Sequence, residues 1–191
     1  MADETLSETL AEYIASLSLE TLPAEITISA KLHILHSLGC LLAASRLEAG
    51  TLAYELAVAN SGTDSTSSLL GSDRHASFPD AVQAMSVAAH CGEMDDIHSG
   101  AGTCVGGLVI PALIGMAEKY GGSGRKMIEA TIAGYETIIR VGLSIDAPKL
   151  FARGWWPSTI CGAFGVAAAG GKFLNWTAPE TANVLGIATL H

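Results

Sequence analysis

The chain has 191 residues, a formal net charge of −9 at pH 7, 49% hydrophobic residues and only 15% charged residues. This composition excludes an intrinsically disordered protein, which needs low hydrophobicity and high charge. Ala and Gly make up more than a quarter of the chain, and such small side chains let backbones approach closely. We therefore expect one close-packed domain whose surface carries few charges.

Helical spacing of apolar residues predicts that most of the chain is helical. The expected helices, in chain order, cover residues 4–17, 23–45, 51–60, 79–91, 108–120, 123–146, 158–174 and 177 onward. Residues 61–75 are predicted to form a loop with one short strand near 68–71, residues 93–107 to be irregular, and residues 146–159, with two prolines, to be a loop. The helix over 158–174 has such small side chains that we expect it at the centre of the fold.

The acidic net charge limits the kinds of partner that we expect, and the cysteines indicate the cellular compartment. Phosphate binding needs a basic face, so nucleic acid is not expected as a ligand. The acidic start lacks the apolar core of a secretory signal, and no uninterrupted apolar stretch reaches roughly 18 residues, so no membrane span is expected. The four cysteines form no CxxC pair, which favours reduced thiols in a cytoplasmic protein. An anionic substrate would need local cations, for which the candidates are Arg140, Lys149, Arg153 and Lys172.

The segment over residues 90–104, HCGEMDDIHSGAGTC, carries the densest set of reactive side chains. His, Asp and Cys are competent metal ligands, but their spacing matches no zinc signature, and we expect no metal. For Asp95 and Asp96, helix capping beside the Gly-rich turn is an equally good alternative to a functional role. His90 lies on an Ala-rich helix and is expected to be a core histidine.

The same segment resembles the MmgE/PrpD family, which includes 2-methylcitrate dehydratase, cis-aconitate decarboxylase and iminodisuccinate epimerase. The family's strip usually reads H-x-x-D-F-D-D-T-H, followed by His-Pro, apolar residues and V-x-P-A, and here it reads HCGEMDDIH and then TCVGGLVIPAL. The likeness continues in order through SGRKMIEATIAGYETIIRVG, GWWPSTICGAFGVAAAGGKFL and APETANVLGIA, and reaches back to HSLGCLLAA and LLGSDRHASFPDAVQAM. The ordered strips cover nearly the whole chain.

The resemblance implies a fold and a class of reaction. The fold is an all-α, multi-helix domain; residues 1–191 would be its N-terminal, incomplete part, without the family's α/β lid domain. Family members are usually homodimers and move a proton at a carbon next to a carboxylate of a small organic acid, in dehydration, decarboxylation or epimerisation. The best-known members need no metal or organic cofactor. Such catalysis needs positioned acids and bases and cations that stabilise developing negative charge.

The resemblance also implies site residues. It assigns catalytic positions to Glu93, Asp95, Asp96, His98 and Cys104, and family site positions to Arg140 and Trp156. Arg140 could instead form a structural ion pair. From the residues themselves, Arg153 and Trp155, beside the GWWP strip, are further candidates for substrate binding. Four residues of the matching strips depart from the family pattern: Glu93 replaces an Asp, Ile97 a Thr, Cys104 a catalytic-type His, and Trp156 a second active-site His. The family's catalytic Lys would lie past residue 191.

The substituted residues leave alternatives open. Cys104, near a helix start, could have a lowered pKa and act as an acid or base, or it could be a small buried residue. Trp155 and Trp156 could line a pocket for a less polar substrate, or serve packing or a subunit interface.

Three hypotheses of function follow. The preferred one is a lyase or isomerase whose site is completed by a second chain or a C-terminal segment. Another is a non-catalytic helical subunit that partners a complete family member. The third is altered chemistry through Cys104. For the preferred hypothesis we expect an exposed apolar face, because an incomplete domain leaves part of its interface uncovered. The expected partner is another family chain in a homo- or hetero-oligomer.

Overall fold

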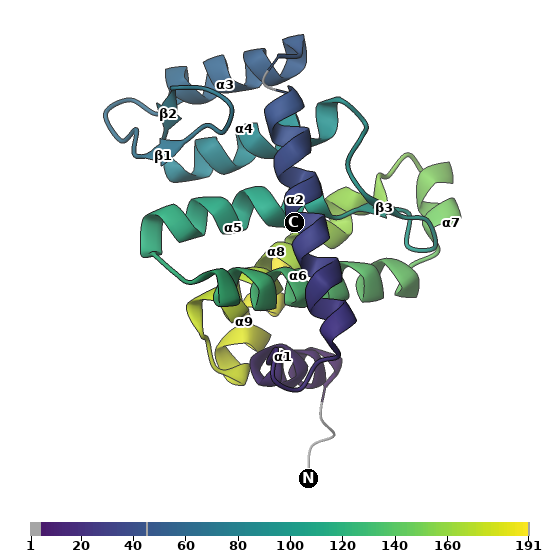
Figure 1. The fold of residues 1–191 in the computed structure, drawn as a ribbon. Helices are drawn as coiled ribbons and strands as arrows, with labels where there is room; N and C mark the ends of the chain where they lie inside the picture. The colour runs from purple at the N-terminus through teal and green to yellow at the C-terminus, as the bar shows by residue number, and fades with distance from the viewer. Residues whose placement is uncertain (1–4, 45, 191) are drawn as a thin grey trace.

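The computed structural model describes residues 5–44 and 46–190, and these are mainly helical (Figure 1). The helices are α1 (Leu6–Ser16), α2 (Ala24–Ala44), α3 (Glu48–Asn60), α4 (Phe78–Cys91), α5 (Gly106–Tyr120), α6 (Gly124–Ser144), α7 (Ala147–Ala152), α8 (Pro157–Leu174) and α9 (Ala178–Ala188). The strands have two residues each and form two antiparallel pairs, β1 (Ser67–Ser68) with β2 (His75–Ala76), and β3 (Ile97–His98) with β4 (Thr103–Cys104). The all-α prediction is confirmed.

Local capping explains where several helices begin. Thr177 accepts a hydrogen bond from the backbone N–H of Glu180, whose carboxylate accepts one from Thr177 N–H in return, so the predicted capping box is present at α9. Ser123 caps α6 by accepting from Lys126 N–H, also as predicted. Side chains of this kind satisfy amide groups that have no partner within the first turn.

The predicted loop over residues 146–159 is wrong in part, because it contains α7. The Asp146 carboxylate accepts a hydrogen bond of 3.2 Å from Lys149 N–H, and a proline occupies the first turn. A proline in the first turn costs no helical hydrogen bond, so here it marks a helix start and not a break. Residues 93–107, predicted to be irregular, include the β3–β4 pair.

Glycines bring α6 and α8 into close contact at the centre of the fold. A Cβ atom added at Gly134 would lie 3.1 Å from the Gly165 carbonyl oxygen, and one added at Gly165 would lie 2.9 Å from Ile138 Cβ. Helix α8 also packs against α5 and α9, which confirms that the small-sided segment is central. The core around it comes from α5, α6 and α8 and includes Val109 and Phe173.

Helix α2 exposes one apolar face. It crosses in front of the other helices in Figure 1 and contacts α4, α5 and α6. On its other side four large apolar side chains are more than half exposed, namely Ile28, Leu32, Leu35 and Leu42. Among the described residues α2 is also the one helix that is long and apolar enough to cross a membrane, and 22% of its most apolar window is buried in the fold.

Candidate active site

The segment between α4 and α5 places two consecutive carboxylates in different surroundings. It leaves α4 at Cys91, forms the β3–β4 pair and enters α5 at Gly106. Because neighbouring residues of an extended chain point to opposite sides, Asp95 and Asp96 face different parts of the molecule. Asp96 faces α2 and α6, and Asp95 faces the end of α4.

Asp96 is held by three helices. Its Oδ1 accepts a hydrogen bond of 2.8 Å from the Gly106 N–H at the start of α5, and its Oδ2 accepts one of 2.8 Å from the Tyr135 hydroxyl on α6. His33 on α2 places its Nδ1 2.6 Å from the same Oδ2. Asp96 thus accepts a hydrogen bond from the first turn of α5, as the helix-capping interpretation of this residue expected. Its catalytic role stays a prediction. A Cβ atom added at Gly106 would lie 2.6 Å from Asp96 Oδ1, so glycine is needed there.

Replacing Asp96 by Asn should destabilise the fold by about 1–3 kcal/mol, because the carboxylate that accepts three hydrogen bonds loses its charge. The new amide NH₂ would also face one of the present donors, Gly106 N–H, the Tyr135 hydroxyl or His33. Urea unfolding followed by circular dichroism measures this change. Asp73→Asn in an exposed turn is the matched control and should change the unfolding free energy by less than about 0.5 kcal/mol. Equal stabilities of the two variants would show that the Asp96 contacts do not hold this segment.

His90 and Asp95 form a hydrogen-bonded pair. His90 Nδ1 lies 2.9 Å from Asp95 Oδ1, and the side chain of Asp95 is only 3% exposed while that of His90 is 44% exposed. The expectation that His90 is a core histidine is therefore wrong, because its position in the last turn of α4 leaves the ring partly open to solvent. With Nδ1 donating to Asp95, the lone pair of Nε2 is available as a base.

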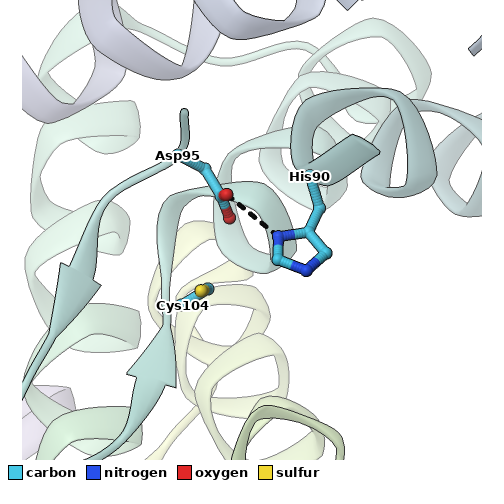
Figure 2. Close-up of side chains that lie close together, drawn as sticks. All are labelled: His90, Asp95 and Cys104. Atoms are coloured by element: carbon cyan, nitrogen blue, oxygen red, sulfur yellow. Dashed lines mark hydrogen bonds and ion pairs between the residues drawn. The ribbon is translucent and has the colours of Figure 1, made fainter. Parts of the chain in front are cut away.

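Cys104 completes a cluster with this pair. Figure 2 shows the reactive atoms of His90, Asp95 and Cys104 gathered between α4, β4 and the preceding loop, and these atoms all lie within 4.8 Å of one another. The backbone N–H of Cys104 donates to Ser158 Oγ at 2.9 Å, which fixes β4 against the start of α8. Asp95 Oδ2 is buried and lacks a hydrogen-bond partner of normal geometry, although the Cys104 thiol interacts weakly with the carboxylate.

The idea that Cys104 has a lowered pKa is wrong. Burial, followed by the charges of Asp95 and Asp96, raises the pKa of the Cys104 thiol to about 11. Glu93 adds a smaller effect in the same direction. Negative charges oppose ionisation of a thiol, and the start of α5 does not compensate for them. At neutral pH Cys104 is therefore a proton-bearing thiol, suited to donate a proton and not to remove one.

We expect Cys104 to react slowly with iodoacetamide. Only the thiolate reacts, so a rise in pKa from 9.0 to about 11 should lower the rate at pH 7.5 on the order of 100-fold relative to the same cysteine in urea-unfolded protein. Peptide mass spectrometry after timed labelling gives both rates. A faster reaction in the folded protein would instead show a lowered pKa.

The cluster opens into a cavity of about 350 Å³. One wall is apolar and has Trp156 at its edge. The ring centroids of Trp156 and His90 are 6.3 Å apart. Trp156 also packs edge-on against Phe151, with ring centroids 5.2 Å apart. The residues that line the cavity are Ser86, Val87, His90, Cys91, Asp95, Cys104, Gly107, Leu108, Trp156, Ser158 and Thr159. Of the residues predicted to form the site, the cavity thus brings together Asp95, Cys104 and Trp156.

The other predicted catalytic residues lie outside this lining. Glu93 is exposed and has a left-handed backbone conformation, with a φ of 46°. The Nδ1 atom of His98 accepts a hydrogen bond from Ala101 N–H at 3.1 Å, which stabilises the turn between β3 and β4. Their catalytic roles stay predictions.

The expected cations are not gathered at the cavity. Both the Nε and the Nη2 of Arg140 bind the Glu136 carboxylate, at 2.9 and 2.7 Å, and the guanidinium lies over the Tyr13 ring. Lys149 pairs with Asp146, and Lys172 donates to the Ala15 carbonyl oxygen. Arg153 and Trp155 are exposed at the end of α7. Within the described chain, none of these residues lines the cavity.

Comparison with known proteins was consistent with the sequence strips. The family model of the MmgE/PrpD N-terminal domain matches residues 8–191. A cis-aconitate decarboxylase-like protein of Aspergillus oryzae is 27% identical over 94% of this chain and 38% of its own length. A cis-aconitate decarboxylase of Aspergillus terreus is 25% identical over 98% of this chain and 39% of its own length. The chain thus spans less than two fifths of these relatives, and it belongs to the MmgE/PrpD family as a form of its helical N-terminal domain.

Proposed function

We propose that the chain is part of a lyase or isomerase that transfers a proton at a carbon next to a carboxylate of a small organic acid. The observation that carries the proposal is the His90–Asp95 pair at the wall of a cavity. Family membership and the similarity to cis-aconitate decarboxylases support the lyase class. Decarboxylation, dehydration and epimerisation all use this proton transfer.

The pair supplies a base of the required kind. Asp95 holds the proton of His90 on Nδ1 and stabilises the imidazolium that forms when Nε2 takes a proton from carbon. The Cys104 thiol, protonated at neutral pH, can return a proton to the carbanion or enolate. Trp156 and Leu108 exclude water from one wall, which strengthens these interactions.

The cavity lacks a cation for the substrate carboxylate. Among the described residues, neither Lys nor Arg lines the cavity, and Asp95 repels an anion. Stabilising an enolate requires positive charge or strong hydrogen-bond donors. We therefore propose that the remaining groups of the site come from a second chain or from a further segment of a longer protein.

Proton exchange in deuterated water tests this proposal. The chain, joined with the second chain or further segment that completes the site, is incubated with cis-aconitate and other small tricarboxylic acids, and NMR follows both deuterium incorporation and loss of carboxylate as CO₂. Exchange or CO₂ release by the wild-type assembly that is lost in Cys104→Ala but kept in Cys91→Ala would support the proposal, and an assembly without either activity would contradict it. Cys91 lines the same cavity, so it is a matched control. Equal rates of the two variants would contradict the role of Cys104.

A non-catalytic helical subunit is the second candidate. The absence of Lys and Arg among the described residues that line the cavity favours it, and the apolar face of α2 is the surface with which it would bind a partner. Ile28, Leu32, Leu35 and Leu42 lie at helical spacing on one face and are 56–66% exposed. A Cβ atom added at Gly39, within the same run, would have no neighbour within 4 Å, so a second helix could approach closely there. We propose that this face binds the helical domain of another MmgE/PrpD chain.

Leu35→Lys should weaken this association, because it places a charge at the centre of the apolar face. Light scattering at several protein concentrations measures the mass, and an apparent dissociation constant at least about 10-fold weaker than wild type is expected for the variant. Ala59→Lys, at an exposed position of α3, adds the same single positive charge and is the control. A wild-type protein that stays monomeric with or without a complete family chain would contradict this candidate.

A further inference from the structure

We propose that His90, Asp95 and Cys104 form a binding site for one divalent metal ion of the zinc type. An imidazole nitrogen, a carboxylate oxygen and a thiolate sulfur are ligands that Zn²⁺ accepts. The three residues come from α4, the following loop and β4, and their ligand atoms already lie within 4.8 Å of one another (Figure 2). The sequence spacing of these three residues matches no zinc motif. The reason is that the tertiary fold, and not a local turn, brings Cys104 close to His90 and Asp95.

The distances are close to those a metal would impose. Tetrahedral Zn²⁺ with bonds of about 2.0–2.3 Å keeps its nitrogen, oxygen and sulfur ligands about 3.3–3.6 Å apart. His90 Nδ1 and Asp95 Oδ1 are 2.9 Å apart, so they need to separate by a few tenths of an ångström. Cys104 needs to move by at most about one ångström, which a rotation of its short side chain allows.

Asp95 gives an independent indication of a missing partner. Its side chain is 97% buried, and Oδ2, at the cavity wall, has no hydrogen bond of normal geometry and interacts only weakly with the Cys104 thiol. A buried carboxylate oxygen with so weak a partner is costly, and a cation bound to both oxygens of the carboxylate would satisfy it. A Cβ atom at position 107 would lie 3.1 Å from this oxygen, so Gly107 keeps the space beside it open.

The charges of the site suit a cation. The Cys104 thiol lies near three negative charges, those of Asp95, Asp96 and Glu93. Among the described residues, the cavity lining contains no Lys or Arg to balance them. Zn²⁺ with one carboxylate, one thiolate and a neutral imidazole is electrically neutral. Binding would release one proton, from the Cys104 thiol to solvent. The fourth position would face the cavity, as in sites that keep one position open.

Metal binding and the proton transfer of the proposed function exclude one another. Zn²⁺ bound to His90 Nδ1 keeps the ring proton on Nε2, which removes the basic lone pair. We therefore infer that zinc inhibits proton exchange and that a chelator restores it. This regulatory consequence rests on the proposed function, whereas the metal site does not.

Equilibrium dialysis of the metal-free full chain against Zn²⁺ tests the site directly. We expect one Zn²⁺ per chain, and Co²⁺ in its place should give the charge-transfer absorption of a cobalt thiolate. Cys104→Ala should lose that absorption and weaken binding at least about 100-fold. Cys91→Ala should keep both, because Cys91 lines the cavity but lies outside the ligand cluster.

Several results would overturn the metal site. Wild-type protein that binds no stoichiometric Zn²⁺ at micromolar concentration would do so, as would equal binding by Cys104→Ala and wild type. Unfolding of Cys104→Ala is checked by circular dichroism, and Asp95→Asn then provides the second variant with the same expected loss. Stoichiometric binding without any effect on proton exchange would leave the site in place and contradict the proposed function instead.

Discussion

Replacing His90 by Gln is expected to lower the rate of proton exchange into a small organic acid by about 10²–10⁴-fold. Gln can keep a hydrogen bond to Asp95 but has no nitrogen that accepts a proton at neutral pH. The loss should appear in the rate of exchange and not in substrate binding, because the ring acts on the reacting carbon. Exchange in deuterated water, followed by NMR over a range of substrate concentrations, separates the two effects.

The control for this prediction is His75→Gln, which changes the same residue type at an exposed position in β2. His75 does not line the cavity, so exchange should fall less than about 3-fold. The double variant His90→Gln, Asp95→Asn should be no slower than His90→Gln alone, because residues that act as a unit are not additive. Additive losses would show that Asp95 does not act through His90.

Local chemistry was predictable from the sequence. The capping box at Thr177 and Glu180 and the N-cap at Ser123 need only residues a few positions apart, and both are present. The many small side chains of residues 158–174 predicted a central helix, because they let neighbouring helices approach its backbone closely. A proline was misleading at α7, since the same residue begins a helix or breaks one according to its position.

The division of roles within the site could not be predicted in this way. Asp95 and Asp96 are neighbours in sequence, and only the contact of Asp96 with Tyr135, 39 positions away, shows that it holds the loop. The pKa of Cys104 depends first on its burial and then on the carboxylates that the fold places near it, and together these outweigh its place next to a helix start. Arg140 matched a family position, yet its guanidinium binds Glu136 within the same helix.

His90 was misjudged for a related reason. An Ala-rich helix predicts a buried face, but α4 ends at Cys91, so its last turn borders the cavity and not the core. The spacing of five residues between His90 and Asp95, across a helix end, was a signal that could have suggested the pair. Ser158 and Thr159, which follow the proline that begins α8, carried no such signal.

Replacing Gly165 by Leu is expected to destabilise the chain by about 3 kcal/mol. A Cβ atom there would lie 2.9 Å from Ile138 Cβ and 3.2 Å from the Gly134 carbonyl oxygen, so α6 and α8 would have to move apart. Val109 and Ala169 pack around the same crossing, which leaves no space for the larger side chain. Urea unfolding followed by circular dichroism gives the change in unfolding free energy.

The matched control is Gly186→Ala, because Gly186 is also a helical glycine but has no atom within 4 Å of an added Cβ. Ala lowers the entropy of the unfolded chain without a clash, so this variant should gain about 0.5–1 kcal/mol. If the unfolding free energy falls for Gly165→Leu and rises for Gly186→Ala, then the close crossing of α6 and α8 requires glycine in α8. A loss below about 0.5 kcal/mol for Gly165→Leu would mean that the two helices can separate freely, and the central position of α8 would then not account for its small side chains.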